Sequence, residues 1–248
     1  MIAKYLGLKV EMDLLSAFCL SDYLGENIAN LKAFERINNS KTLVVGAGPS
    51  IEEKEIQNYI LKIYETHRSR RNKLDNSQLV IMVADGAAEL LLELGIIPDF
   101  VISDLDGNYE SLISANQKGS IMVIHAHGDN IQKIKSLISN FNNIIGTTQT
   151  FPFKNIFNFG GFTDGDRCVF LAEEFLAKEI ILIGMDFDSS IGNYSKRIIV
   201  DIAFKRKKLF VAKNLIESLS KQTICEIVNV SSSKYGSSIY GVTKNIII

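Results

Sequence analysis

Short runs rich in valine and isoleucine recur along the chain, and each is followed by glycine or aspartate and then by a segment of helical periodicity. Because these runs are apolar on both alternating faces, they are typical of parallel strands covered by helices on both sides. The pattern predicts an α/β fold, with a doubly wound, mostly parallel sheet and flanking helices. The predicted strands are TLVVG at 42–46, LVIMVA at 79–84, FVISD at 100–104, IMVIHA at 121–126, IIGTT at 144–148 and IILIGMD at 180–186. The predicted helices cover 49–67, 87–94, 131–138 and 167–177, where large apolar residues recur at spacings of three and four.

The two ends of the chain differ from this central pattern. Residues 1–40 contain no run of the strand type and are expected to form a helical N-terminal cap, with a turn near Ser21 and Asp22. Residues 41–190 are expected to form the α/β core in which the catalytic residues should lie. Residues 191–248 are expected to add a basic helix over about 199–221 and a final strand at CEIVNVSSS, a small C-terminal extension of the same domain.

Composition excludes several classes of partner. No apolar stretch approaches the ~20 residues that a membrane-spanning helix needs, so no membrane partner is expected. The first residues, MIAKYLGLKVEMD, place acids where a signal peptide needs an apolar segment, so the chain is expected to be cytoplasmic. With 27 basic against 28 acidic residues, the chain lacks the basic excess of a nucleic-acid-binding protein, and no nucleic-acid partner is expected.

Aspartates follow the predicted strands. Of the 13 aspartates, nine lie between residues 85 and 188, whereas glutamates in this span fall mostly on helical segments. Helix capping is an equal alternative for Asp129 or Asp166 alone. Capping does not explain carboxylates that converge on one sheet edge, because they repel each other unless a cation neutralises them. The expected cation is Mg²⁺, which prefers oxygen ligands and commonly bridges carboxylates to phosphates.

Three Asp-x-Asp elements stand among these aspartates, at 104–106, 164–166 and 186–188. The first is the most informative, because it follows FVIS directly and precedes Gly107, which allows the chain to turn both carboxylates into the crevice. An isolated Asp-x-Asp is a weak signal, since such pairs also occur in nucleotide-sugar glycosyltransferases and in plain loops. The setting PDFVISDLDG is far more specific.

The loop GAGPS after the first predicted strand suggests an anion site. Gly46 and Gly48 would let backbone N–H groups approach a phosphate, and Pro49 suits the first position of a helix. A dinucleotide fingerprint would need Gly or Ala where Ile51 stands, and no P-loop motif occurs, so neither an NAD site nor a P-loop kinase is expected.

The histidines and the basic residues complete the set of candidates. Three histidines are too few for a zinc cage, and of the pair in HAHGDN, His125 is equally explained by packing at a strand end. His127 and Asp129 flank Gly128 on a turn and are better placed to meet a ligand. Eight Lys or Arg residues occur between 196 and 221, most simply as a solvated helix face. Lys196, after a strand-end acid cluster, and Arg167 are the candidates for neutralising a transferred phosphate.

Seven strings in order, GAGPS, ADGA, PDFVISDLDG, HAHGDN, FGGFTDGDR, GMDF and YSK, resemble the archaeal 6-hydroxymethyl-7,8-dihydropterin pyrophosphokinases. The resemblance spans about residues 42–235. The middle strings are also similar to the catalytic core of thiamine pyrophosphokinases, which has DGG and PD-x-x-x-GD-x-D. Here Ala87 replaces the second Gly of DGG, and Ser103 replaces the Gly before the first Asp of the longer string. These departures weaken the similarity to the thiamine enzymes more than that to the pterin enzymes.

The resemblance implies a transferase that moves the diphosphoryl group of ATP to the hydroxymethyl oxygen of the pterin and releases AMP. ATP and a pterin would be the partners, Mg²⁺ the cofactor, and a pterin cofactor of the tetrahydromethanopterin or folate type the final product. Phe162 would stack on the ring, and catalysis would consist of positioning and charge neutralisation. The implied metal ligands are Asp104, Asp106 and Asp85, the implied phosphate or nucleoside contacts are Gly46, Gly48 and Ser50, and the candidates for metal or acceptor are Asp129, Asn130, Asp164 and Asp166.

Three alternatives stay open at this point: a thiamine-type pyrophosphokinase, a glycosyltransferase-like protein that binds a sugar nucleotide, and a non-catalytic nucleotide-binding module. The oligomeric state is also open, because a homo-oligomer contact could use the first 40 or the last 20 residues.

Overall fold

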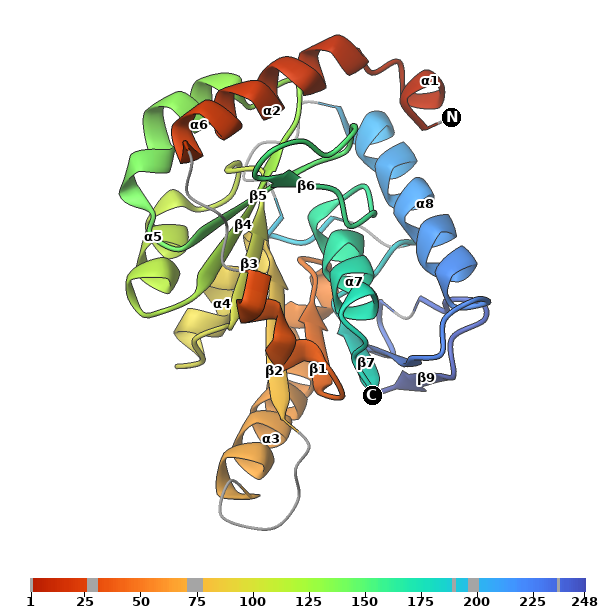
Figure 1. The fold of residues 1–248 in the computed structure, drawn as a ribbon. Helices are drawn as coiled ribbons and strands as arrows, with labels where there is room; N and C mark the ends of the chain where they lie inside the picture. Colours follow the sequence, from red (N-terminus) through yellow and green to blue (C-terminus); the bar gives the residue numbers. More distant parts are fainter. Residues whose placement is uncertain (1, 26–30, 71–77, 189–190, 196–200, 236) are drawn as a thin grey trace.

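The computed structural model describes residues 2–25, 31–70, 78–188, 191–195, 201–235 and 237–248 (Figure 1). The strands in this part of the chain are β1 (Lys41–Val45), β2 (Leu79–Ala84), β3 (Phe100–Ser103), β4 (Ile121–Ala126), β5 (Ile144–Thr148), β6 (Ile156–Phe157), β7 (Glu179–Ile183), β8 (Glu226–Ser231) and β9 (Lys244–Ile247). They form one nine-stranded sheet in the order β6-β5-β4-β3-β2-β1-β7-β8-β9, and all eight neighbouring pairs are parallel. The predicted α/β fold class is confirmed.

Helices cover both faces of this sheet. The α-helices are α1 (Ile2–Leu6), α2 (Val10–Leu24), α3 (Lys54–Arg70), α4 (Ala88–Glu93), α5 (Tyr109–Gln117), α6 (Ile131–Leu137), α7 (Asp164–Glu174) and α8 (Ile202–Leu219). Short 3-10 helices are η1 (Leu31–Ile37), η2 (Pro49–Glu52), η3 (Asp85–Ala87) and η4 (Ile138–Asn140).

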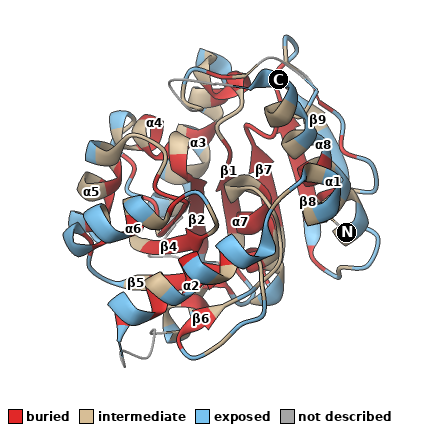
Figure 2. Cartoon of the chain, turned by 90° about the horizontal axis from the view of Figure 1, so that it is seen from above, coloured by how far each residue is buried: buried red, intermediate tan, exposed pale blue. Residues whose placement is uncertain are grey.

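Two hydrophobic clusters hold the layers together. The first packs α2 to α6 against one face of the sheet, for example through Leu20 and Ile60. The second packs η1, α7 and α8 against the other face, through Phe34, Val169 and Ile216. Figure 2 shows that the buried residues are concentrated in the strands between these layers. Each cluster draws residues from all three segments, 1–40, 41–190 and 191–248.

The strand order reverses at β1. The chain runs outward from β1 through β2 to β6, and then returns to the other side of β1 to form β7, β8 and β9. Val45 at the end of β1 is level with Val83 of β2 and Ile183 of β7. The loops that follow these three strands therefore leave the sheet at one height, and the crevice between them is where open parallel sheets bind ligands.

All seven predicted strands are present, each within three residues of its predicted ends, but some elements differ. The turn expected near Ser21 and Asp22 is wrong, because α2 continues to Leu24. Ser21 lies within the helix, and its hydroxyl donates to Asn155 Oδ1 over 2.9 Å. The side chain therefore has a hydrogen-bond partner without a turn. The elements α5, β6 and β9 were not predicted; β6 has only two residues, and β9 has an exposed pattern without apolar alternation.

Among the described residues, no helix combines the length and the apolar character needed to cross a bilayer.

Candidate active site at the carboxyl edge of the sheet

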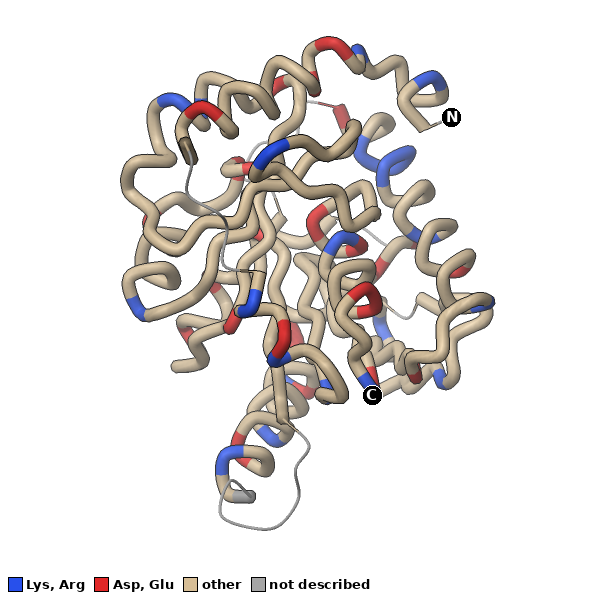
Figure 3. Tube along the Cα trace, in the orientation of Figure 1, with Lys and Arg blue, Asp and Glu red and all other residues tan. Residues whose placement is uncertain are grey.

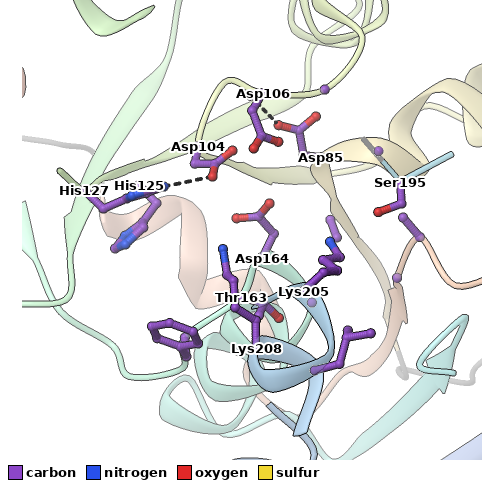
Figure 4. A pocket seen from close by; sticks show the side chains of 18 of the residues that line it. Asp85, Asp104, Asp106, His125, His127, Thr163, Asp164, Ser195, Lys205 and Lys208 are labelled. Atoms are coloured by element: carbon purple, nitrogen blue, oxygen red, sulfur yellow. Dashed lines mark hydrogen bonds and ion pairs between the residues drawn. The ribbon is translucent and has the colours of Figure 1, made fainter. Parts of the chain in front are cut away.

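A cavity of about 450 Å³ lies at the carboxyl ends of the central strands. Its walls come from the loops after β1, β2, β3, β4, β5 and β7 and from the amino-terminal halves of α2, α7 and α8. Figure 4 shows Asp85, Asp104 and Asp106 gathered on one wall, with Lys205 and Lys208 across the cavity from them. The cavity thus occupies the crevice where the strand order reverses.

Asp85, Asp104 and Asp106 form a compact acidic cluster, in which one ligand atom from each residue lies within 4.8 Å of the others. Leu105, between two of them, adopts a left-handed φ of 64°, which is uncommon for leucine and turns the chain sharply. Ser103 supports this turn, because its hydroxyl donates to Asp85 Oδ2 over 2.5 Å and accepts the Leu105 N–H over 2.8 Å. The serine that departs from the thiamine-enzyme string therefore braces the acidic cluster.

Burial makes this cluster electrostatically costly. Burial, and then the neighbouring Asp104 charge, raise the pKa of Asp85 to about 6. Burial together with Asp104 and Asp85 raises the pKa of Asp164, which lines the same cavity, well above its usual value. Carboxylates in such an arrangement favour either protons or a cation. Since the cluster offers only carboxylate oxygens, it fits a hard divalent ion such as Mg²⁺, which Asp85, Asp104 and Asp106 would hold.

His127 joins the acidic cluster to a second carboxylate. Its Nε2 lies 2.9 Å from Asp104 Oδ2, and its Nδ1 lies 2.7 Å from Asp129 Oδ1. Although burial lowers the pKa of His127, the hydrogen bonds to Asp104 and Asp129 raise it to about 9. At neutral pH the ring is therefore an imidazolium that fixes the Asp104 carboxylate in place.

Basic residues of α8 form the opposite wall. Lys205 and Lys208 line the cavity, one turn apart on the same helix face, and Lys208 Nζ lies 5.7 Å from the centroid of the Phe162 ring. Lysine and arginine recur along α8, as Figure 3 shows for this helix. Lys196, the basic residue that the sequence singled out, lies outside the described residues. Sequence reasoning missed Lys205 and Lys208 as site residues, although their spacing of three on a predicted helix indicates that they share one helix face.

The backbone N–H groups of the GAGPS loop bind other protein groups, which differs from the predicted anion site. The N–H of Gly46 donates to Ile183 O over 2.8 Å, and the N–H of Gly48 donates to Gly184 O over 2.9 Å. The N–H of Ser50 donates to Asp186 Oδ2 over 2.8 Å. The expectation that the glycine N–H groups approach a phosphate is therefore wrong for this conformation, because they join the loops that follow β1 and β7.

Close packing explains why these two positions are glycine. A Cβ at Gly46 would lie 2.6 Å from Gly184 O, and a Cβ at Gly48 would lie 2.4 Å from Asp186 Oδ2. Both glycines still line the cavity, whereas Ser50 is fully buried beside it.

Three further predicted residues serve the local structure. Asp166 accepts the Phe162 and Thr163 N–H groups and pairs with the Thr163 hydroxyl in a capping box at the start of α7, so capping, the alternative weighed for it, is confirmed. Asn130 uses both its donors and its acceptor, which bind Asp104 O, His125 O, Ser16 Oγ and His127 N. Arg167 is buried and donates to Gly160 O and Gln149 Oε1.

The cavity brings together most of the predicted site residues. Those that line it are Gly46, Gly48, Asp85, Asp104, Asp106, His127, Asp129, Phe162 and Asp164. Those that do not are Ser50, Asn130, Asp166 and Arg167.

The structure adds wall residues that sequence reasoning missed. Asp13 of α2 is buried, accepts the Gly128 N–H over 2.8 Å, and accepts Gln149 Nε2 over 2.7 Å. Both Asp13 and Gln149 line the cavity, as does Met12. No local motif marks α2, which looked like a cap, so only the folded chain reveals this contribution.

The segment 191–195 forms the wall beside the GAGPS loop. The Asn193 backbone N–H and Nδ2 each donate to the Glu52 carboxylate over 2.6 Å, and Tyr194 OH donates to Glu93 Oε2 over 2.6 Å. These bonds hold Ser195 at the end of the cavity away from His127 (Figure 4).

Comparison with known proteins places the chain in a family. The family model described as "6-hydroxymethylpterin diphosphokinase MptE-like" matches residues 20–192. Curated proteins named 6-hydroxymethyl-7,8-dihydropterin pyrophosphokinase are similar to the chain. The protein from Methanocaldococcus jannaschii is 43% identical, covering 90% of this chain and 92% of its own. That from Pyrococcus furiosus is 41% identical, covering 93% and 94%. That from Methanothermobacter thermautotrophicus is 40% identical, covering 75% and 76%.

A solved structure shares the fold. A glycosyltransferase from Magnetospirillum magneticum superposes with a TM-score of 0.50 at 15% identity, covering 91% of this chain and 39% of its own. At that identity the likeness shows the α/β architecture alone. The family match and the three archaeal relatives show that the chain belongs to the 6-hydroxymethylpterin diphosphokinase MptE-like family.

Proposed function

We propose that this protein transfers the terminal diphosphoryl group of ATP to the hydroxymethyl oxygen of 6-hydroxymethyl-7,8-dihydropterin in a Mg²⁺-dependent reaction. The alcohol oxygen bonds to the β-phosphorus, the bond from that phosphorus to the α,β-bridging oxygen breaks, and AMP leaves while the hydroxyl proton is released. The names of the archaeal relatives support the pterin as acceptor. One observation carries the proposal: the acidic cluster of Asp85, Asp104 and Asp106 faces Lys205 and Lys208 across a single cavity.

Opposed charges suit a polyphosphate. Asp85, Asp104 and Asp106 would hold Mg²⁺, which when bound neutralises charge on the phosphates. Lys205 and Lys208 supply positive charge from the other side, so the transferred group lies between two fixed walls. Catalysis of phosphoryl transfer depends mainly on such positioning and charge stabilisation. Together these effects lower the activation barrier by several kcal/mol, and one well-placed group contributes roughly 3 kcal/mol.

The cavity has room for a substrate on each side of these charges. His125 and His127 lie at one end and Ser195 at the other, with the acids and lysines between them (Figure 4). We assign the nucleoside of ATP to the Ser195 end, where Gly48, Gly86 and Gly192 form part of the cavity wall. The pterin then takes the His127 end, where Phe162 offers an aromatic face.

The substrates can be tested by supplying different acceptors and donors. Purified protein with Mg·ATP should consume ATP when 6-hydroxymethyl-7,8-dihydropterin is present, and should not do so with thiamine. In a parallel thermal denaturation series with Mg²⁺, ATP should raise Tm more than a UDP- or CMP-sugar does, because a ligand that binds the folded state stabilises it. ATP consumption with thiamine but not with the pterin would identify a thiamine-type enzyme. Stabilisation by a sugar nucleotide alone would identify a glycosyltransferase-like protein.

A further inference from the structure

His125 occupies the penultimate position of β4 and borders the cavity next to His127. Its side chain is 2% exposed, and its Nε2 has no hydrogen-bond partner among the described residues. Buried polar atoms are nearly always hydrogen-bonded in folded proteins, so an imidazole nitrogen without a partner at a cavity wall calls for an explanation. A ligand that donates a hydrogen bond there is such an explanation.

The neighbouring strand fixes which nitrogen carries the proton. His125 is paired in register with Thr147 of β5, whose hydroxyl donates to Ile124 O over 3.1 Å. Because the Thr147 proton is used in that bond, its oxygen can only accept from His125 Nδ1, which lies 3.4 Å away. Nδ1 therefore bears the hydrogen, and Nε2 presents a lone pair.

The surroundings keep this ring neutral. Burial, then the Arg167 guanidinium and the His127 ring, lower the pKa of His125 well below its usual value. A neutral imidazole with a protonated Nδ1 is a hydrogen-bond acceptor at Nε2 and has little capacity to take up a proton. The ring is thus suited to recognising a donor and poorly suited to removing a proton from the attacking alcohol.

The position of His125 agrees with ring recognition. Its ring stacks on that of His127 at 5.6 Å between centroids, and it is His127 that contacts Asp104 of the acidic cluster. Of the two stacked rings, His127 therefore holds the acidic cluster, and His125 keeps its Nε2 available to a ligand. A substrate whose hydroxymethyl group reaches the acidic cluster would place its heterocycle beside His125.

We propose that His125 Nε2 accepts a hydrogen bond from a ring or amino N–H of the pterin, and that His125 thereby selects the acceptor substrate. The proposal rests on the proposed function, since it takes a pterin as the acceptor. Dihydropterins carry N–H donors at the 2-amino group, N3 and N8, so the lone pair of Nε2 complements this class of heterocycle. Thr147 acts as a positioning residue, because its hydroxyl holds the tautomer that exposes the lone pair.

The test measures pterin binding without turnover. Isothermal titration calorimetry with 6-hydroxymethyl-7,8-dihydropterin is carried out on protein saturated with Mg²⁺ and α,β-methylene-ATP, in which the bond to be broken is blocked. His125→Phe keeps a planar ring but removes the acceptor, and it should weaken pterin binding roughly tenfold or more. His125→Gln places an amide oxygen near the position of Nε2 and should restore affinity to within about threefold of wild type. Binding of the ATP analogue should change by less than about twofold in both variants.

Variants of Thr147 and direct observation of the ring make the test independent of how His125→Phe folds. Thr147→Val should weaken pterin binding a few-fold, roughly the effect of one neutral hydrogen bond, and Thr147→Ser should not. In wild-type protein labelled with ¹⁵N-histidine, Nε2 of His125 should resonate as an unprotonated nitrogen and shift when the pterin is added. Equal pterin affinity in wild type and His125→Phe, or a protonated Nε2, would overturn the role of His125 even if the enzyme turns over pterin. Absence of pterin binding to wild-type protein would instead refute the proposed function.

Discussion

His127 Nε2 lies 2.9 Å from Asp104 Oδ2, so a charged imidazole clamps one carboxylate of the acidic cluster. The other ring nitrogen contacts Asp129, which is largely exposed, and the two carboxylates together raise the pKa of His127 to about 9 against the effect of burial. Partners that orient a metal-binding carboxylate are often as important to the metal as the carboxylate itself.

His127→Gln should lower Mg²⁺ affinity by roughly 10- to 100-fold, because the glutamine loses the charge and the fixed geometry that orient Asp104. Asp129→Asn is the matched control, because it weakens the contact that the other nitrogen of the His127 ring makes on the exposed side. It should change Mg²⁺ affinity by less than about threefold. Calorimetric titration of Mg²⁺ into each protein measures the difference. Equal Mg²⁺ affinity in wild type and His127→Gln would show that the bond to Asp104 does not support the metal site.

Gly107→Ala should disrupt the acidic cluster by a purely steric effect. A Cβ at this position would lie 1.6 Å from Asp85 Oδ1, so the carboxylate must move away from its partners. Gly95→Ala provides the comparison, since Gly95 has a positive φ of 73° and no atom within 4 Å of an added Cβ. It should cost about 1 kcal/mol of stability through backbone strain and leave the site intact. Mg²⁺ binding retained in Gly107→Ala would mean that Asp85 is not held where the structure places it.

The effect of Mg²⁺ on stability should depend on pH. Burial and Asp104 raise the pKa of Asp85 to about 6, so the folded chain binds this proton more tightly than the unfolded chain does. The corresponding stability is present below the ordinary pKa of an aspartate and is lost as pH rises through about 6 in metal-free protein.

Because Mg²⁺ competes with that proton, it should raise Tm more at about pH 7.5 than at about pH 5. Asp85→Asn should remove most of this difference. Thermal denaturation of both proteins, with and without Mg²⁺, measures the effect. A Tm increase of the same size at both pH values in the wild type would contradict cation binding at the acidic cluster.

Lys208→Met should lower kcat/KM for ATP by roughly 10- to 100-fold, because the ammonium that faces the acidic cluster across the cavity is lost. Lys213→Met changes the same helix at a residue that instead pairs with Asp188 over 2.5 Å, and should alter activity by less than about twofold. Steady-state kinetics with varied ATP separates the two. Similar losses in both variants would indicate that α8 needs its lysines for stability and not for the polyphosphate.

Much of the fold followed from local patterns. The six long apolar runs predict the central strands because a strand buried on both faces must be apolar at every position, and this holds for β2, whose six residues are all buried. The edge strands β6 and β9 lack that signal, because β6 has only two residues and β9 is mostly exposed. The N-terminal cap looked independent of the site, yet Asp13 of α2 reaches Gly128 and Gln149 through contacts that join residues more than 100 positions apart.

The sequence predicts those site residues whose positions follow from the strand topology alone. It predicts less well the residues whose roles depend on hydrogen bonds within the fold. Asp85, Asp104 and Asp106 follow adjacent parallel strands, so their carboxylates must meet at one edge of the sheet. The glycine N–H groups of the GAGPS loop look free in the sequence but are used inside the fold. Such bonds depend on which loops lie side by side, a relation that a single sequence does not contain.

The nucleotide product shows which phosphorus of ATP the acceptor attacks. Protein is incubated with Mg·ATP and 6-hydroxymethyl-7,8-dihydropterin, and the nucleotides and pterins are separated by chromatography. We predict AMP and the pterin diphosphate in equal amounts, formed only when the pterin is present, and a loss of at least ~10²-fold in rate for Asp106→Asn with an unchanged circular dichroism spectrum. ADP as the sole nucleotide product, or ATP consumption that does not depend on the pterin, would contradict transfer of the diphosphoryl group to the pterin.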